Sequence, residues 1–126
     1  MPRATVNIDE TETKTLKSAP PDGFVVLRRM TYGESVQRRA MLKMSIETGK
    51  SRKDFKGEMA FASEEIQRFE FAHCIVDHNL EKEDGSKLNL SLPVDFASLD
   101  PRIGQEIEEL INGMNNFEDN EDDLGN

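Results

Sequence analysis

The sequence predicts an α+β fold that is mostly helical. We expect three main helices, a small antiparallel hairpin region near the N-terminus and a disordered acidic C-terminal tail. Three segments repeat apolar residues at helical spacing, whereas two short segments around a Pro-Pro-Asp-Gly turn are β-rich or alternating. A chain of 126 residues suffices for one domain. We place it at residues 19–116, after an extended or partly disordered arm at 1–18 and before the tail at 117–126.

The predicted strands come from short β-rich patterns. Threonine alternates with other residues between positions 11 and 16, which is typical of an exposed edge strand. The run Phe24–Met30 is bounded by turn residues and predicts a second strand, which can form a hairpin with the first. The segment Lys87–Leu92 alternates polar and apolar residues, so we expect a third short strand that Pro93 ends.

The first predicted helix covers residues 31–47. Thr31 and Glu34 have the spacing of a capping box, in which each side chain bonds the backbone N–H of the other residue. The apolar residues of this segment recur at helical spacing, and we expect them to form the apolar face of an amphipathic helix that Gly49 and the basic run at 50–56 end: Val36, Ala40, Leu42 (or Met41), Met44 and Ile46.

Two further helices are predicted. Ser63 is a good N-cap, and the apolar positions after it predict a largely buried helix that ends near His78; an earlier start at Met59 or Phe61 is the alternative. Asp100 followed by Pro101 is typical of the start of a helix. The apolar face of this last helix is formed by Ile103, Ile107, Leu110 (or Ile111) and Met114.

Charge is distributed unevenly along the chain. The net charge is −9, and such a surface repels nucleic acid and anionic lipid, so we expect neither as a partner. Residues 28–56 hold nine Lys or Arg and three Asp or Glu, a net charge of +6, whereas residues 93–126 hold one basic and ten acidic residues, a net charge of −9. These regions can attract each other within one molecule or engage separate partners.

The cysteine content and the apolar runs indicate the compartment. Cys74 is the sole cysteine, so a disulfide within the chain is impossible and a reducing compartment is expected. The N-terminal residues lack the apolar core of a signal peptide, and no apolar run approaches the length of a membrane span. We therefore expect a cytoplasmic protein.

One cluster contains residues that ligate metals. On a helix, Cys74 and His78 share one face while His73 and Asp77 share another, so no face supplies three ligands. A Cys74–His78 dyad is conceivable, but Cys74 is better explained as a core residue. No glycine-rich phosphate loop is present. We expect no enzyme, no metal and no cofactor.

Amphipathic and basic surfaces remain as candidate binding sites. The last helix has an apolar face that either belongs to the core or docks a partner helix: Ile103, Ile107, Leu110, Ile111 and Met114. Four arginines of the basic region are candidates for contact with the acidic tail or an acidic partner: Arg28, Arg29, Arg38 and Arg39.

Three stretches of the sequence resemble a known family. They are residues 23–39, which begin Gly-Phe-Val-Val-Leu-Arg-Arg-Met-Thr-Tyr-Gly-Glu, residues 75–93, and residues 99–107, which read Leu-Asp-Pro-Arg-Ile-Gly-Gln-Glu-Ile. Over roughly residues 12–116 the chain is similar to tail assembly chaperones of long-tailed bacteriophages and prophages. The resemblance implies a protein that binds the tape-measure protein, keeps it soluble, helps to recruit tail tube subunits and is absent from the mature virion. It implies no catalytic residues.

Two other functions are compatible with the sequence. A structural minor tail or connector protein of the virion would be found in purified particles. An acidic inhibitor that mimics nucleic acid would need acids spread over a folded surface, whereas here they are concentrated in the tail at residues 117–126. A chaperone is also expected to self-associate weakly.

Overall fold

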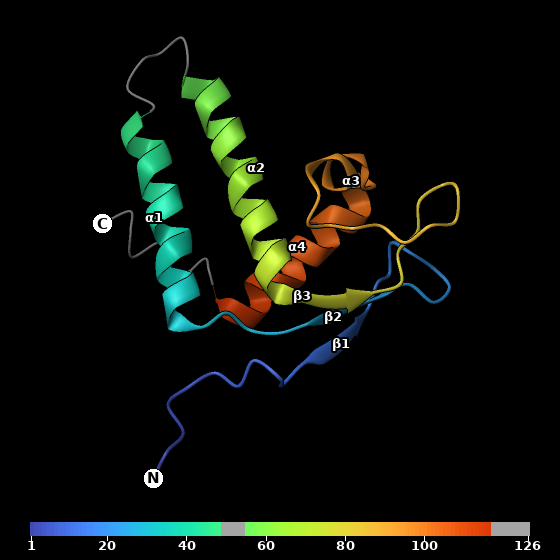
Figure 1. The fold of residues 1–126 in the computed structure, drawn as a ribbon, viewed down its shortest axis with the longest axis horizontal. Coiled ribbons are helices and arrows are strands. Elements are labelled where there is room, and N and C mark those ends of the chain that lie inside the picture. Colours follow the sequence, from blue (N-terminus) through green and yellow to red (C-terminus); the bar gives the residue numbers. More distant parts are fainter. Residues whose placement is uncertain (49–54, 117–126) are drawn as a thin grey trace.

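The computed structural model describes the backbone of residues 1–48 and 55–116, and the side chains of residues 1–44 and 64–116. Within these ranges the fold contains four helices and a three-stranded antiparallel sheet, which confirms the predicted α+β class. The elements follow in the order β1 (Glu12–Thr15), β2 (Phe24–Leu27), α1 (Tyr32–Thr48), α2 (Phe55–Cys74), β3 (Ile75–His78), α3 (Pro93–Ser98) and α4 (Pro101–Asn115). Figure 1 shows α1 and α2 side by side as a helical hairpin, with α4 and the sheet at its base.

The predicted N-terminal hairpin is confirmed. Strand β1 pairs antiparallel with β2, with Glu12 opposite Leu27. In the connecting turn, the Gly23 N–H donates to the Ala19 carbonyl over 2.8 Å. A Cβ atom on Gly23 would lie 2.4 Å from both the Cβ and the carbonyl oxygen of Ala19, so this turn requires glycine. Leu16, at the end of β1, is buried in the core, so the folded domain starts near Glu12 and not at residue 19.

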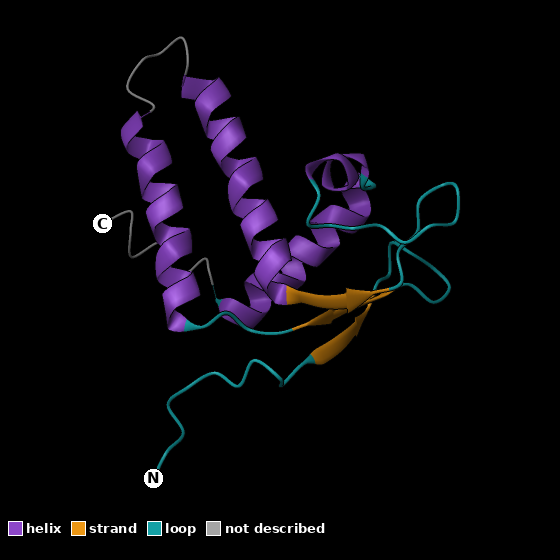
Figure 2. Ribbon diagram, viewed as in Figure 1, coloured by secondary structure: helices purple, strands orange, loops and turns teal. Residues whose placement is uncertain are grey.

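The second helix begins before all the predicted starting points and ends before the predicted end near His78. Helix α2 begins at Phe55, so Ser63 lies inside the helix and is not its N-cap. The helix ends at Cys74, and the following residues form β3, which pairs antiparallel with β2. Ile75 and Val76 are β-branched and suit a strand, and their pairing completes the sheet that Figure 2 shows in orange.

The predicted strand at Lys87–Leu92 is also wrong, because only Lys87 forms a bridge, to Glu81, and that bridge is isolated. Leu88 and Leu90 are buried as their alternation indicated. The backbone between them is bonded locally, since the Asn89 N–H donates to Asp95 Oδ2 over 2.8 Å. Such side-chain bonds compete with strand pairing. Pro93, expected only to end a strand, begins the short helix α3, which the sequence pattern did not predict.

The last helix matches its prediction. The Asp100 carboxylate accepts a hydrogen bond from the Arg102 N–H over 2.9 Å and so caps α4, with Pro101 in the first turn. Asn116 ends the helix in the left-handed conformation, at φ 55°. The core cluster that α4 joins is formed by Leu16, Val25, Leu27, Met30, Phe71, Cys74, Leu80, Leu88, Leu90, Ile107 and Ile111.

Two predictions fall on residues that the structure does not describe. The basic run expected to end the first helix includes residues 50–54, and the tail expected to be disordered is residues 117–126. Both lie outside the described residues. In the part of the chain that is described, no helix is long and apolar enough to cross a membrane.

Candidate functional site

Helix α1 turns a charged residue toward the protein interior. Arg38, which the sequence places away from the apolar face of this helix, is buried against α2. Its Nε lies 2.9 Å from Oε1 of Glu70, which is also buried. A buried charge needs such an opposite charge beside it. Because the Arg38 side of α1 faces α2, three residues of the expected apolar face are exposed, namely Val36, Ala40 and Met44. Met41 and Leu42 are half-buried.

The outward residues form one continuous apolar row, which we name the α1 stripe: Tyr32, Val36, Ala40 and Met44. Tyr32 is 78% exposed, Val36 42% and Met44 64%, and Ala40 is exposed as well. Residues four apart lie on one face of a helix, and these four positions cover about 18 Å along its axis. In Figure 1, α1 lies at the outer edge of the molecule, next to α2. Large apolar side chains gathered in this way are typical of a docking surface.

Positive charge borders the α1 stripe on one side. The Arg39 guanidinium lies over the Tyr32 ring, with its central carbon 5.8 Å from the ring centroid. Lys43 is exposed one turn further along, and Arg29 is exposed just before the helix. None of these three cations forms an ion pair with any residue whose side chain the structure describes. The stripe and its border therefore suit an apolar partner that carries acidic groups.

The first turn of α1 is fixed by Glu34. Its carboxylate accepts two hydrogen bonds from Arg28, over 3.0 and 2.9 Å, and a third from the Thr31 N–H over 2.9 Å. His73 Nδ1 lies 2.7 Å from the same carboxylate. The Glu34 N–H donates to the Thr31 hydroxyl over 3.3 Å, so the predicted capping box is confirmed. The hydrogen bonds from Arg28 lower the pKa of Glu34 from 4.5 to about 2.

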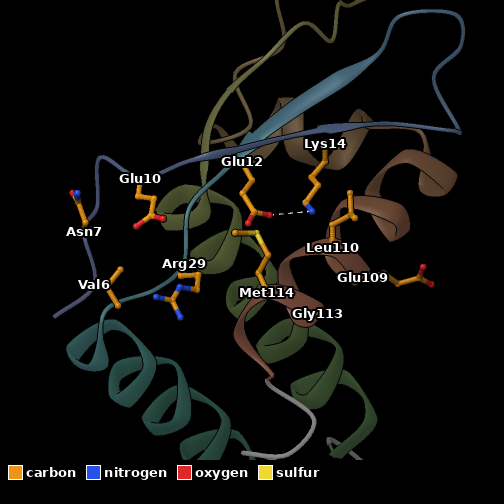
Figure 3. Close-up of a pocket in the computed structure, with 10 residues that line it drawn as sticks. All are labelled: Val6, Asn7, Glu10, Glu12, Lys14, Arg29, Glu109, Leu110, Gly113 and Met114. Atoms are coloured by element: carbon orange, nitrogen blue, oxygen red, sulfur yellow. Dashed lines mark ion pairs between the residues drawn. The ribbon is translucent and has the colours of Figure 1, made fainter. Parts of the chain in front are cut away.

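A second candidate is a hollow of about 400 Å³ between the N-terminal arm and α4. Figure 3 shows Val6 and Asn7 of the arm on one side and Leu110 and Met114 of α4 on the other, with Arg29 between them. The hollow also contains three acids and a lysine: Glu10, Glu12, Glu109 and Lys14. Lys14 is 3.0 Å from Glu12. Mixed charges of this kind select no ligand of one sign, so the hollow indicates no particular chemistry.

The structure places the residues predicted to bind a partner in different environments. Ile107 and Ile111 are fully buried, so they belong to the core, which is the first of the two roles expected for the apolar face of the last helix. Ile103 packs against that core, as do Leu110 and Met114, which also line the hollow. Among the arginines, Arg28 is neutralised by Glu34 and Arg38 by Glu70, whereas Arg29 lines the hollow and Arg39 lies over Tyr32 of the α1 stripe.

The stripe itself was not recognised as a site from the sequence. The sequence shows the spacing of four between Tyr32, Val36, Ala40 and Met44, and it predicts only that the last three share the apolar face of an amphipathic helix. The signal that could have corrected this was the scarcity of apolar residues to cover α1 in so small a chain. A narrow core cannot bury both sides of a helical hairpin.

The only cluster of metal-ligating residue types does not form the helix faces that its spacing suggested. His73 and Cys74 end α2, whereas Asp77 and His78 belong to β3. Among the described residues, no group of three or more His, Cys, Asp or Glu side chains is placed to hold a metal ion. Burial raises the pKa of the Cys74 thiol to about 12, which keeps it protonated at neutral pH and unreactive as a nucleophile.

Comparisons with known proteins add no family to this description. A scan against protein-family models and searches of the curated proteins and of the solved structures gave no match to the chain. Fold and surface define a class only: a small α+β protein that presents an apolar helix face with a basic border.

Proposed function

We propose that this chain is a phage tail assembly chaperone, which binds a helical segment of the tape-measure protein on the α1 stripe without catalysis. It acts in the host cytoplasm, keeps the tape-measure protein soluble, helps to recruit tail tube subunits and is absent from the mature virion. The family is suggested by the resemblance of residues 12–116 described above. The surface on which we place the binding is suggested by the exposure of the α1 stripe.

The single observation that supports the binding surface most is the outward apolar row on α1. The row includes Tyr32, Val36 and Met44, and it points away from α2 while Arg38 takes the buried side. An amphipathic partner helix can bury a row of this length by laying its own apolar face along it. Tyrosine and methionine suit such a surface, because tyrosine buries a large area and methionine adapts to different partners.

The partner segment should carry acidic residues beside its apolar positions. Arg39 and Lys43 border the stripe and have no ion pair with a described residue. Complementary charge fixes the orientation of a bound helix and increases its rate of association. The remaining surface is acidic, with a net charge of −9 for the chain, and a high net charge keeps a complex with an aggregation-prone chain in solution.

The proposal is tested by co-expressing this chain with the tape-measure protein of the same phage or prophage. We expect the tape-measure protein to become soluble and to co-purify with the native chain. The double variant Val36→Gln/Ala40→Gln should bind about tenfold more weakly, because it removes apolar surface from the stripe while glutamine preserves the helix. The matched control is Val94→Gln, since Val94 lies on α3 and is 78% exposed.

Circular dichroism of each variant excludes unfolding as the cause of lost binding. A tape-measure protein that stays insoluble beside the native chain would refute the chaperone proposal. Stoichiometric amounts of this chain in purified particles would favour a structural tail protein instead. Equal binding by the stripe variant and the Val94→Gln control would retain a chaperone but remove the α1 stripe as its binding surface.

A further inference from the structure

We propose that two copies of this chain pair through the outer edge of β1, antiparallel and with Thr13 of each copy at the centre, so that their two sheets join into one. This contact between copies requires no tape-measure protein. Three features of β1 support it: the strand is an open edge, its outward backbone groups belong to threonines, and its charges are self-complementary in one register.

Strand β1 is an open edge of the sheet. The strands lie in the order β1-β2-β3, and β1 pairs with β2. Within residues 1–48 and 55–116, no strand lies on the outer side of β1. Figure 1 shows β1 at the margin of the molecule, with the N-terminal arm continuing away from the sheet. Such an edge presents unpaired N–H and C=O groups to which another strand can bond.

The backbone groups that face outward belong to threonines. At the end of β1, the Leu16 N–H donates to the Gly23 carbonyl over 2.8 Å and so points to the β2 side. Alternate residues of an antiparallel strand bond the same neighbour, so Glu12 and Lys14 also bond β2. The residues between them direct their N–H and C=O groups to the open edge: Thr11, Thr13 and Thr15.

Strand β2 supports this assignment. Thr15 lies opposite Phe24, and the Phe24 N–H donates to Asn79 Oδ1 over 2.9 Å instead of to β1. The backbone groups of Thr15 therefore point away from β2. Thr13 and Thr15 are exposed, and β-branched threonines facing each other across two strands stabilise their pairing.

The charges of β1 select one register of self-pairing. When Thr13 lies opposite Thr13 of the second copy, Glu12 lies opposite Lys14 of the second copy and Lys14 lies opposite its Glu12. These charged pairs alternate with the hydrogen-bonded threonine pairs, at positions where facing side chains approach most closely. A centre at Glu12 or at Lys14 would keep the hydrogen bonds but would place like charges opposite each other.

The two charged side chains are accessible to a second copy. They project from the same face of β1 and lie 3.0 Å apart within one chain, as Figure 3 shows. The side chain of Glu12 is 59% exposed and that of Lys14 is 37% exposed. Both line the hollow of about 400 Å³, which leaves space beside them. In the pair of copies, each charge gains a second opposite charge and keeps the first.

A second copy fits this edge better than a neutral strand does. A lysine on a sheet edge usually prevents pairing, because an uncharged strand offers nothing to its ammonium group. A second copy places an acid opposite Lys14 and a base opposite Glu12. The strand has 4 residues, so the contact is small. Small interfaces are weak, and we expect a dissociation constant on the order of 100 µM.

Charge reversal tests the pairing in full-length chains. Lys14→Glu leaves two acids on the edge and Glu12→Lys leaves two bases, so each variant alone should associate at least about tenfold more weakly than the native chain. An equimolar mixture of the two variants should form a heterodimer with about the native affinity, because every facing pair again combines opposite charges. The double variant Glu12→Lys/Lys14→Glu should self-associate like the native chain for the same reason.

Sedimentation equilibrium measures these affinities over roughly 10 µM to 1 mM protein. A cysteine pair then tests the register. The Cα atoms of the central Thr13 pair should be about 5.5 Å apart, so Thr13→Cys should form an intermolecular disulfide. The matched control is Thr15→Cys, because the two copies of residue 15 are four residues out of register and about 13 Å apart. Cys74 is buried and does not compete.

A native chain that stays monomeric at 1 mM overturns the inference. So does a mixture of the two single variants that associates no better than either variant alone, provided circular dichroism shows both to be folded. Equal disulfide formation by Thr13→Cys and Thr15→Cys contradicts the proposed register. If Val36→Gln/Ala40→Gln abolishes association while the charge reversals do not, the copies meet on the α1 stripe and the β1 contact is refuted.

Discussion

Replacing Glu34 should strongly destabilise the base of the helical hairpin formed by α1 and α2. Its carboxylate bonds Arg28 and the Thr31 N–H and lies 2.7 Å from His73 Nδ1. The side chain is 17% exposed, so solvent screens these contacts only in part. Lowering its pKa from 4.5 to about 2 corresponds to about 3 kcal/mol in the free energy of unfolding at neutral pH. We expect Glu34→Gln to lose about 2–3 kcal/mol, because glutamine keeps the size but not the charge.

The contribution of Glu34 should disappear in acid. A carboxyl whose pKa is lower in the folded state than in the unfolded state binds fewer protons when folded. Its stabilisation is complete above pH 4.5 and is lost as the pH falls from 4.5 towards 2. Urea unfolding followed by circular dichroism at pH 7, 5, 4 and 3 measures this directly. The difference between native chain and variant should be constant down to about pH 5 and then shrink.

The control for this experiment is Glu65→Gln, which removes an exposed carboxylate from α2. Surface charges of this kind change the free energy of unfolding by less than about 0.5 kcal/mol. If Glu34→Gln costs no more than Glu65→Gln at pH 7, or if the cost of Glu34→Gln is the same at pH 3, the reasoning about this carboxylate is refuted.

Three other predictions concern the core and the helix ends. Arg38→Met alone should lose about 3–5 kcal/mol because it removes the cation 2.9 Å from the buried Glu70 carboxylate, while Arg38→Met/Glu70→Leu should recover most of this loss, as urea unfolding will measure. Cys74 is fully buried with a pKa of about 12, so iodoacetamide should modify it only in urea, and labelling of the native protein at neutral pH would contradict the described core. Asp100→Ala should cost about 1 kcal/mol in unfolding experiments by removing the cap of α4, whereas an equal cost for Asp100→Asn would indicate a role of its charge.

Local chemistry explains the features that the sequence predicted well. The hairpin of β1 and β2 follows from a turn in which Gly23 has no space for a Cβ atom. The starts of α1 and α4 follow from Glu34 with Thr31 and from Asp100, whose side chains bond backbone N–H groups within three residues. Such signals depend only on neighbours in the sequence, so they can be recognised without the fold.

Tertiary contacts explain the features that were predicted wrongly. Ile75 and Val76 continue the helical pattern of α2, but pairing with β2 takes them into a strand. Leu88 and Leu90 alternate as in a strand, but the Asp95 carboxylate bonds the Asn89 N–H and holds the backbone in a loop. In both places the backbone conformation is determined by a contact with residues outside the segment that carries the pattern.

The candidate site shows the same limit of local patterns. A periodic row of apolar residues predicts an amphipathic helix, but it does not say whether the apolar or the polar side faces the core. In α1 the decision depends on Glu70, 32 residues after Arg38, which supplies the opposite charge inside the protein. The same contact leaves Val36 and Met44 exposed, and so the α1 stripe arises together with a buried ion pair.

The central claim is that a helix of the tape-measure protein lies on the α1 stripe. The most direct measurement places a photo-crosslinking amino acid at Val36 and, as a control, at Val94 of α3, which is the more exposed of the two, in full-length chains co-expressed with that protein. We predict that illumination links residue 36 to one or a few tape-measure segments whose apolar positions are flanked by acids, and that residue 94 gives no such product. Equal crosslinking at both positions, or none at residue 36 while the proteins co-purify, would contradict this account of the binding surface.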